Sequence, residues 1–174
     1  CYPNSNLRGN PNDPVPSIDA NPLKGLDAGS NFHTVANAKG IYIDLLSYFR
    51  QHQDILFVVI TAPPLSDAKN SANARAFNQW LVHDWLKDYP YNNVAVFDFY
   101  NVLTTNGGSA KQHDLGSESG NHHRWWQNHI QHVVDTSGGL HNTNAYPTAK
   151  GDDHPGTAGN QKATAEFVPL LNIA

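Results

Sequence analysis

The sequence has little of several features that assign a protein to a class. It has no methionine, one cysteine (Cys1), and a formal net charge of −4 without any run of basic residues. A single cysteine excludes an internal disulfide and leaves the redox compartment open. The low positive charge argues against nucleic acid and anionic membranes as main partners. The longest apolar run, Ile55–Ile60, is too short to span a bilayer, so the sequence predicts no membrane span.

The absence of methionine predicts that these 174 residues do not begin at a translation start and that the chain is processed or is a fragment. No signal-peptide pattern is present, although a mature protein would already have lost one. Cys1 has two interpretations: the lipid-carrying residue of a mature lipoprotein, or the point at which a longer chain was cut. Plentiful Asn, Gly, Pro and aromatic residues beside scarce lysine favour a secreted, periplasmic or cell-surface protein.

Alternating helical and strand patterns after a Pro- and Asn-rich start predict an α/β fold in one domain over residues 1–174. The continuous run 55–60 is typical of a strand buried on both faces. Residues 104–150 are expected to be a loop-rich insertion. In the final helix, Thr157 is the expected N-cap and Pro169 is expected to kink or end it. The predicted elements are helix 34–51, strand 55–60, helix 71–88, strand 94–98, short helix 122–134 and a final helix from residue 157.

Polar residues follow both predicted strands. Ligands of parallel sheets bind at the carboxyl ends of the strands, so residues 61–64 and 98–100 are expected to border a site. Asp98 has a second interpretation as a helix N-cap or turn residue, and this one is favoured over a catalytic role. Another signal, His154 directly before Pro155, opens the final helix. Its imidazole titrates near neutral pH and suits a general base.

The order of these motifs resembles the SGNH (GDSL-like) hydrolases. Members have a strand that ends in a Thr/Pro-rich loop, a later strand that ends in an aspartate, and a His-Pro loop that opens the last helix. Here the corresponding segments are Phe57–Pro64, Val96–Phe99 and Asp152–Asn160. The resemblance covers residues 35–172 apart from 104–150. It implies a three-layer sandwich with a parallel sheet, the flavodoxin-like architecture of that family, which is incomplete in this chain.

The resemblance also implies a role for some residues. His154 matches the general base of a serine acyl-enzyme mechanism. The family's aspartate, three residues before the histidine, falls on Gly151, so Asp152, Asp153 or a backbone carbonyl is left to orient the imidazole. Asn4 is best placed to match the asparagine that donates to the developing oxyanion. Asn12 is the alternative, and a turn asparagine among prolines explains either position equally well.

The family's nucleophilic Gly-Asp-Ser block occurs nowhere in the 174 residues. The sequence therefore predicts the C-terminal part of an esterase that needs no cofactor or metal and whose nucleophile lies on an N-terminal fragment or a separate chain. The substrate is an ester, and carbohydrate deacetylation is suggested by family analogy alone. The alternative is a noncatalytic extracellular binding or structural protein derived from the same fold.

Two further sets of residues have competing interpretations. Histidines are ligands for zinc, copper or nickel, and His129 and His132 lie one turn apart in the predicted helix. Few carboxylates accompany the histidines, however, so solvated loop residues are the favoured interpretation. Aromatic side chains suit either a sugar-stacking platform or packing, and packing is expected for Trp80 and Trp85. The histidines are His113, His122, His123, His129, His132 and His141, and the platform aromatics are Trp125, Trp126, Tyr146, Tyr89 and Tyr91.

Overall fold

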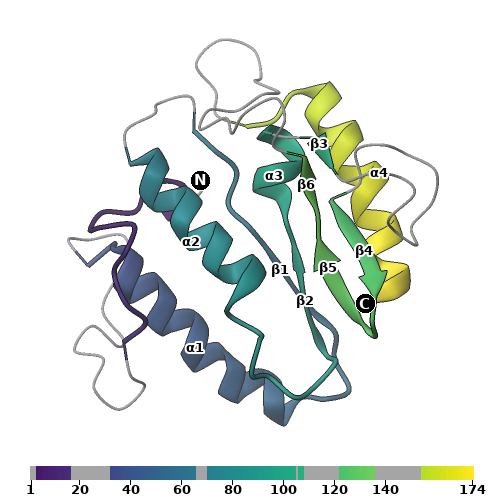
Figure 1. The fold of residues 1–174 in the computed structure, drawn as a ribbon, viewed down its shortest axis with the longest axis horizontal. Coiled ribbons are helices and arrows are strands. Elements are labelled where there is room, and N and C mark those ends of the chain that lie inside the picture. The colour runs from purple at the N-terminus through teal and green to yellow at the C-terminus, as the bar shows by residue number, and fades with distance from the viewer. Residues whose placement is uncertain (1–2, 17–31, 66–69, 105, 108–121, 136–153) are drawn as a thin grey trace.

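Two parallel strands lie between two layers of other elements (Figure 1). The computed structural model describes residues 3–16, 32–65, 70–104, 106–107, 122–135 and 154–174. Strand β1 (Phe57–Ile60) pairs in parallel with β2 (Val94–Phe97), with Phe57 opposite Val94. Helices α1 (Val35–Gln51) and α2 (Ser71–His83) lie on one side of this pair. The other side holds β4 (His123–Trp126), β5 (His129–His132) and α4 (Thr157–Ile173).

Three short elements complete the described fold. The 3₁₀ helix η1 (Pro3–Asn6) packs against α2. Helix α3 (Phe99–Thr104) follows β2 directly and packs against α4. Strands β3 (Asn106–Gly107) and β6 (Val134–Asp135) form a two-residue antiparallel pair. The chain is thus a mixed α/β protein with a small parallel sheet, as the sequence predicts.

The layer of α1 and α2 follows the expected helical patterns. The side chain of Thr34 caps α1 by accepting a hydrogen bond from the Asn37 N–H at 3.2 Å. Trp80 and Trp85 are 8% and 3% exposed, which confirms the packing predicted for them. The Trp85 indole N–H also donates to the Tyr42 carbonyl at 3.0 Å, so its polar group is satisfied inside the core.

The expected burial of the strand 55–60 on both faces is wrong. Ile55 and Leu56 precede β1 and are 42% and 41% exposed, and Ile60 is 51% exposed. Phe57 packs toward α1 and α2, while Val58 packs toward α4. The physical reason is that, among the described residues, β2 is the one strand that pairs with β1, so the outer edge of β1 stays open.

The expected short helix over 122–134 is also wrong, because these residues form the antiparallel hairpin β4–β5. Gln127 and Asn128 join the strands and adopt left-handed conformations, with φ of 48° and 65°. Two consecutive left-handed residues define the type I′ turn that matches the twist of a hairpin. Four-residue strands with aromatic and β-branched residues flank this turn, and helical spacing between them is coincidental.

The final helix differs from the expectation in two details. Thr157 is its first residue and Gly156 occupies the N-cap position, so the predicted cap is one residue too late. Of the two outcomes expected at Pro169, a kink or an end of the helix, the end is wrong, because the helix continues to Ile173; the kink stays a prediction. A proline inside a helix removes the hydrogen bond to the carbonyl four residues earlier. That carbonyl belongs to Ala165, which is exposed, so water is able to satisfy it.

The hairpin turn gives a direct test of this part of the fold. Replacing Asn128 by valine is expected to lower the free energy of unfolding by roughly 1–2 kcal/mol, since a β-branched side chain is strained in the left-handed region. Replacing Asn128 by glycine is expected to change it by less than about 0.5 kcal/mol. Urea denaturation of both variants measures the difference, and equal midpoints for the two would contradict the type I′ turn.

Candidate functional site

His154 lies where the sequence places it, on the loop that enters α4, and it is half-buried. Pro155 is buried, and its carbonyl accepts a hydrogen bond from the Asn160 amide at 3.1 Å. In Figure 1 the start of α4 lies at the end of the molecule toward which β1 and β2 run. The catalytic role of His154 stays a prediction. Its expected orienting residues, Asp152 and Asp153, lie outside the described residues.

Asn4 lies on η1. The next residue of η1, Ser5, contacts the loop that follows β1. Ser5 is 2% exposed, and its hydroxyl donates to the carbonyl of Pro63. The amide of Asn4 donates to the Tyr42 hydroxyl at 3.3 Å, so it is engaged within the fold. Burial raises the pKa of Tyr42, and the bond from Asn4 lowers it in part. The alternative, Asn12, is exposed, and its N–H donates to a side-chain oxygen two residues earlier, which is a turn contact.

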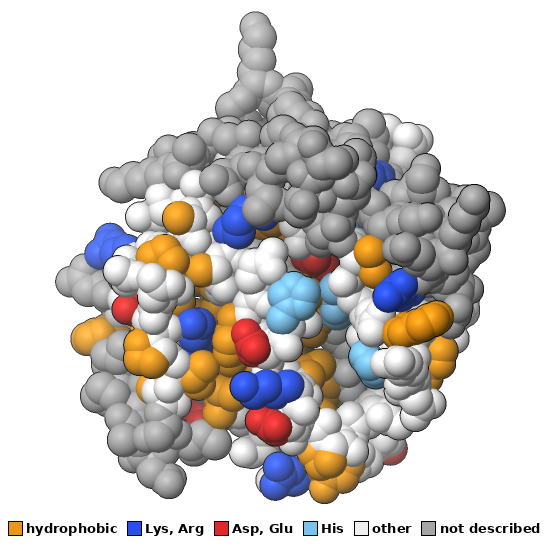
Figure 2. Space-filling model, viewed as in Figure 1, with side chains coloured by type: hydrophobic (Ala, Val, Ile, Leu, Met, Phe, Trp, Pro, Cys, Tyr) orange, Lys and Arg blue, Asp and Glu red, His pale blue; other side chains and the backbone are white. Residues whose placement is uncertain are grey.

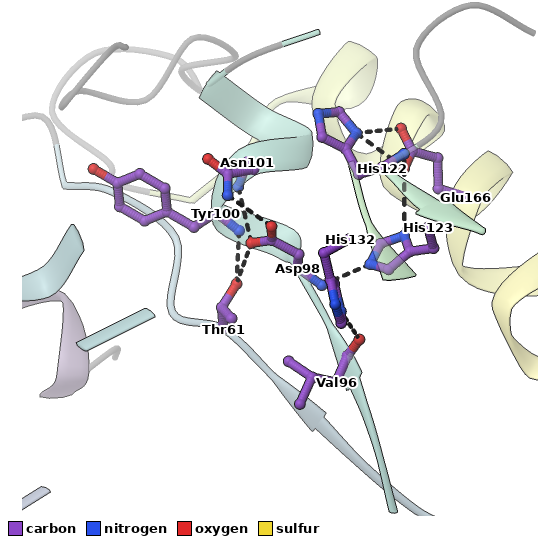
Figure 3. Close-up of polar contacts among 9 residues, drawn as sticks. All are labelled: Thr61, Val96, Asp98, Tyr100, Asn101, His122, His123, His132 and Glu166. Atoms are coloured by element: carbon purple, nitrogen blue, oxygen red, sulfur yellow. Dashed lines mark hydrogen bonds and ion pairs between the residues drawn. The ribbon is translucent and has the colours of Figure 1, made fainter. Parts of the chain in front are cut away.

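Asp98 is fully buried at the carboxyl end of β2 and accepts several hydrogen bonds (Figure 3). Its Oδ2 accepts from the Asn101 amide at 2.6 Å, and its Oδ1 lies 3.4 Å from both the Asn101 N–H and the Thr61 hydroxyl. The Thr61 hydroxyl oxygen accepts from the Tyr100 N–H at 2.9 Å. These contacts fix the start of α3, so the favoured interpretation of Asp98 as a helix-capping residue is confirmed.

Two imidazoles occupy the outer edge of β2. The backbone groups of Asn93 and Phe97 bond to β1, so by alternation those of Val96 and Asp98 point away from it. His132 Nε2 donates to the Val96 carbonyl at 2.9 Å, and the Asp98 N–H donates to His123 Nε2 at 2.8 Å. His123 and His132 are directly opposite each other in the hairpin. Together they take the place of a neighbouring strand.

Glu166 of α4 contacts His123 on the side away from β2, and it also contacts the neighbouring His122. Asp98, His122, His123, His132 and Glu166 are called the buried network below. Its carboxylate accepts from the His122 N–H at 2.8 Å and from His122 Nδ1 at 2.9 Å, and it lies 3.6 Å from His123 Nδ1. Both histidines are almost fully buried. Burial raises the pKa of Glu166, but the hydrogen bonds from His122 and the nearby ring of His123 outweigh it and lower the pKa to about 2. Glu166 is therefore ionised at neutral pH.

The bonds also assign protons to the rings. His123 Nε2 accepts an N–H, so the proton of the neutral ring is on Nδ1, on the side of Glu166. His132 donates from Nε2 to the Val96 carbonyl, so the proton of its neutral ring is on Nε2. Burial, with the nearby His123, lowers the pKa of His132 to about 4, although Asp98 and the Val96 carbonyl raise it.

His122, His123 and Glu166 are buried, so they serve to support the fold rather than to contact a substrate. Within the described residues, no three His, Cys, Asp or Glu side chains form a group suited to a metal ion. His129 and His132 belong to a strand, so their expected spacing of one helical turn is wrong. His113, His141, Tyr146 and Cys1 lie outside the described residues. The role of the histidines was missed because it depends on contacts 25 to 44 residues apart.

A pocket of about 1000 Å³ opens near the amino end of β2, a feature that the sequence did not predict. It lies between the end of α2, the segment before β2, the hairpin β4–β5 and the end of α4. Figure 2 shows a hollow on this face with histidine side chains around it. The described lining includes aromatic, amide and basic side chains, among them His83, Lys87, Tyr89, Tyr91, Trp125, His129 and Gln131.

Comparisons with models of known protein families, with curated proteins and with solved structures gave no match. The resemblance to SGNH hydrolases therefore stays a prediction from the sequence. None of the described helices is long and apolar enough to cross a membrane.

The buried network predicts that acid destabilises the fold. The pKa of His132 is about 4 in the folded chain against 6.5 ordinarily, so its contribution is complete above pH 6.5 and is lost between pH 6.5 and 4. The pKa of Glu166 is about 2 against 4.5, so its contribution is lost between pH 4.5 and 2. Each loss is expected to be about 3 kcal/mol.

Urea denaturation across this pH range measures the free energy of unfolding. His132→Gln should flatten the upper part of the decline, and Glu166→Gln the lower part. Exposed His129 is the control, since His129→Gln should leave both parts unchanged. A wild-type stability that stays constant from pH 6.5 to 4 would contradict the placement of His132.

Proposed function

We propose that this chain is part of an SGNH-type ester hydrolase in which His154 is the general base. The observation that carries the proposal is the position of His154 on the loop that enters α4, at the carboxyl end of a parallel strand pair. Sites in parallel α/β sheets occur at this end. The order of strand, α2, strand and final helix matches the one that the resemblance implies. Helices also pack on both faces of the sheet, α1 and α2 on one face and α4 on the other.

Within the described parts of the chain, no strand pairs with the outer edge of β1, and this supports the proposal that another polypeptide segment supplies the nucleophile. Phe57 and Thr61 donate to β2, so by alternation the backbone groups of Val58 and Ile60 face outward. Apolar residues are exposed beside this edge, which is the kind that accepts an added strand. A parallel strand added there would place its own carboxyl end beside Thr61, at the same end of the sheet as His154. With that strand the sheet approaches the full three-layer sandwich.

The proposed reaction uses a serine from the added segment. His154 takes the proton of the serine hydroxyl as the oxygen attacks the ester carbonyl, and it returns the proton to the leaving alcohol. Water, activated by the same imidazole, then releases the acid and frees the serine. Asn4 is the proposed oxyanion donor, which requires its amide to turn from the Tyr42 hydroxyl. Asp152 or Asp153 is the proposed orienting residue for the imidazole.

The test uses the protein isolated from its natural source with any polypeptide bound to it. Hydrolysis of p-nitrophenyl acetate is measured, and a fluorophosphonate probe followed by mass spectrometry identifies the reactive serine. The labelled serine is expected in a Gly-Asp-Ser segment outside these 174 residues. His154→Ala is expected to lower kcat by at least about 10³-fold, because the serine then has no base.

His52 gives a matched control, because it lies at the end of α1 and its ring Nδ1 contacts the Tyr48 carbonyl at 2.8 Å. His52→Ala is expected to keep the wild-type rate. The proposal fails if the His154 variant hydrolyses the ester at that rate, or if the isolated protein shows no labelled serine.

A further inference from the structure

The pocket near the amino end of β2 is separate from the proposed ester hydrolase site. It is lined by Ile173, at the end of α4, whereas His154 precedes the start of that helix. Helix α4 has 17 residues, so its two ends lie about 25 Å apart at the usual rise of an α-helix. A ligand in this pocket therefore does not compete with the chemistry proposed for His154. With about 1000 Å³, the pocket has the size of a small-molecule or oligosaccharide site.

The charge of the pocket differs from that of the whole chain. The chain has a formal net charge of −4. Yet the described lining residues include Lys87 and Arg124, and they include no aspartate or glutamate. The two carboxylates nearest in sequence, Asp84 and Asp88, are not among the lining residues. Positive side chains gathered in a concave site concentrate the field and attract anions.

The remaining side chains suit a sugar. Tyr89, Tyr91 and Trp125 supply ring faces, and Tyr91 is 39% exposed. The Tyr89 hydroxyl donates to the Asn93 side chain at 2.9 Å, and the Tyr89 and Tyr91 rings meet edge to face. Such rings offer a rigid apolar surface with a polar tip. These features favour a flat, hydroxylated ligand over a purely apolar one.

Amide groups are placed beside these rings. Asn92, Asn128 and Gln131 line the pocket, and amides both donate to and accept from hydroxyl groups. Gln131 Oε1 accepts a hydrogen bond from Arg124 Nε at 2.8 Å, across the hairpin. This bond holds the guanidinium in place before any ligand arrives. Preorganised groups lower the entropic cost of binding.

We propose that this pocket binds an acidic oligosaccharide that contains uronic acid residues. The sugar carboxylates pair with Lys87 and Arg124, the sugar rings stack on Trp125 and Tyr91, and the amides bond to hydroxyl groups. The site rests on the fold and not on the proposed ester hydrolysis. It also gives the noncatalytic binding function a specific location on the molecule.

The first test compares two sugars of equal length, tetragalacturonate and the neutral cellotetraose, by isothermal titration calorimetry with the full chain. Tetragalacturonate is expected to bind saturably, and at least about tenfold more tightly than cellotetraose. Its affinity should fall with added salt, because ionic pairs at a partly exposed site are screened. Equal affinity for both sugars, or no saturable binding of either, would overturn the proposal.

Matched variants locate the site. Lys87→Gln and Trp125→Ala are each expected to weaken tetragalacturonate binding about tenfold. Tyr48 lies on α1, is 52% exposed and is outside the lining, so Tyr48→Ala is the aromatic control and should leave the affinity unchanged. Lys162 is on α4 and outside the lining, so Lys162→Gln is the lysine control. Circular dichroism confirms that each variant is folded.

An NMR titration of the histidine side chains gives a readout inside the pocket. A sugar bound in the pocket should change the chemical shifts of the exposed lining histidines His83 and His129. Binding that shifts no lining histidine, or that survives both Lys87→Gln and Trp125→Ala, would place the sugar elsewhere and overturn the proposal. Because these tests measure binding and not turnover, their failure leaves the hydrolase proposal standing, and failure of the hydrolase assay leaves this one standing.

Discussion

The described fold depends on how the backbone groups at the outer edge of β2 find hydrogen-bond partners. The Val96 carbonyl and the Asp98 N–H point away from β1, and both residues are buried. A buried backbone group without a partner costs roughly 1–3 kcal/mol. Two imidazoles from the hairpin supply the partners, one as donor and one as acceptor. Through Glu166 the same hairpin is bonded to α4, so the edge of one strand determines where a whole layer sits.

The two edges of the sheet are therefore unlike each other. Side chains close the outer edge of β2, whereas the described residues place no strand on the outer edge of β1, which has the exposed Ile60 at its end. A closed edge fixes the final helix, and with it the loop that holds His154. An open edge is suited to receive another strand. The two proposed sites lie at opposite ends of α4. The proposed catalytic histidine precedes its start, and the basic, aromatic pocket lies at its end.

Local patterns predicted α1, α2, β1, β2 and α4, because helical spacing and continuous apolar runs are short-range signals. The hairpin was missed, although Gln127 and Asn128 lie midway between His123 and His132 and mark a two-residue turn. The pairing of His122 with Glu166 joins residues 44 positions apart, and nothing in one sequence shows such a contact. The same reason hid the pocket, whose walls come from three segments that are far apart in the sequence, 82–96, 124–133 and 173–174.

The central claim, that imidazoles take the place of a strand beside β2, is tested most directly by the tautomers of His123 and His132. Long-range ¹H–¹⁵N correlation NMR at neutral pH distinguishes them. The structure predicts the Nδ1–H tautomer for His123, which accepts at Nε2, and the Nε2–H tautomer for His132, which donates to the Val96 carbonyl. Identical tautomers for the two rings, or rapid exchange between tautomers in either, would contradict the account.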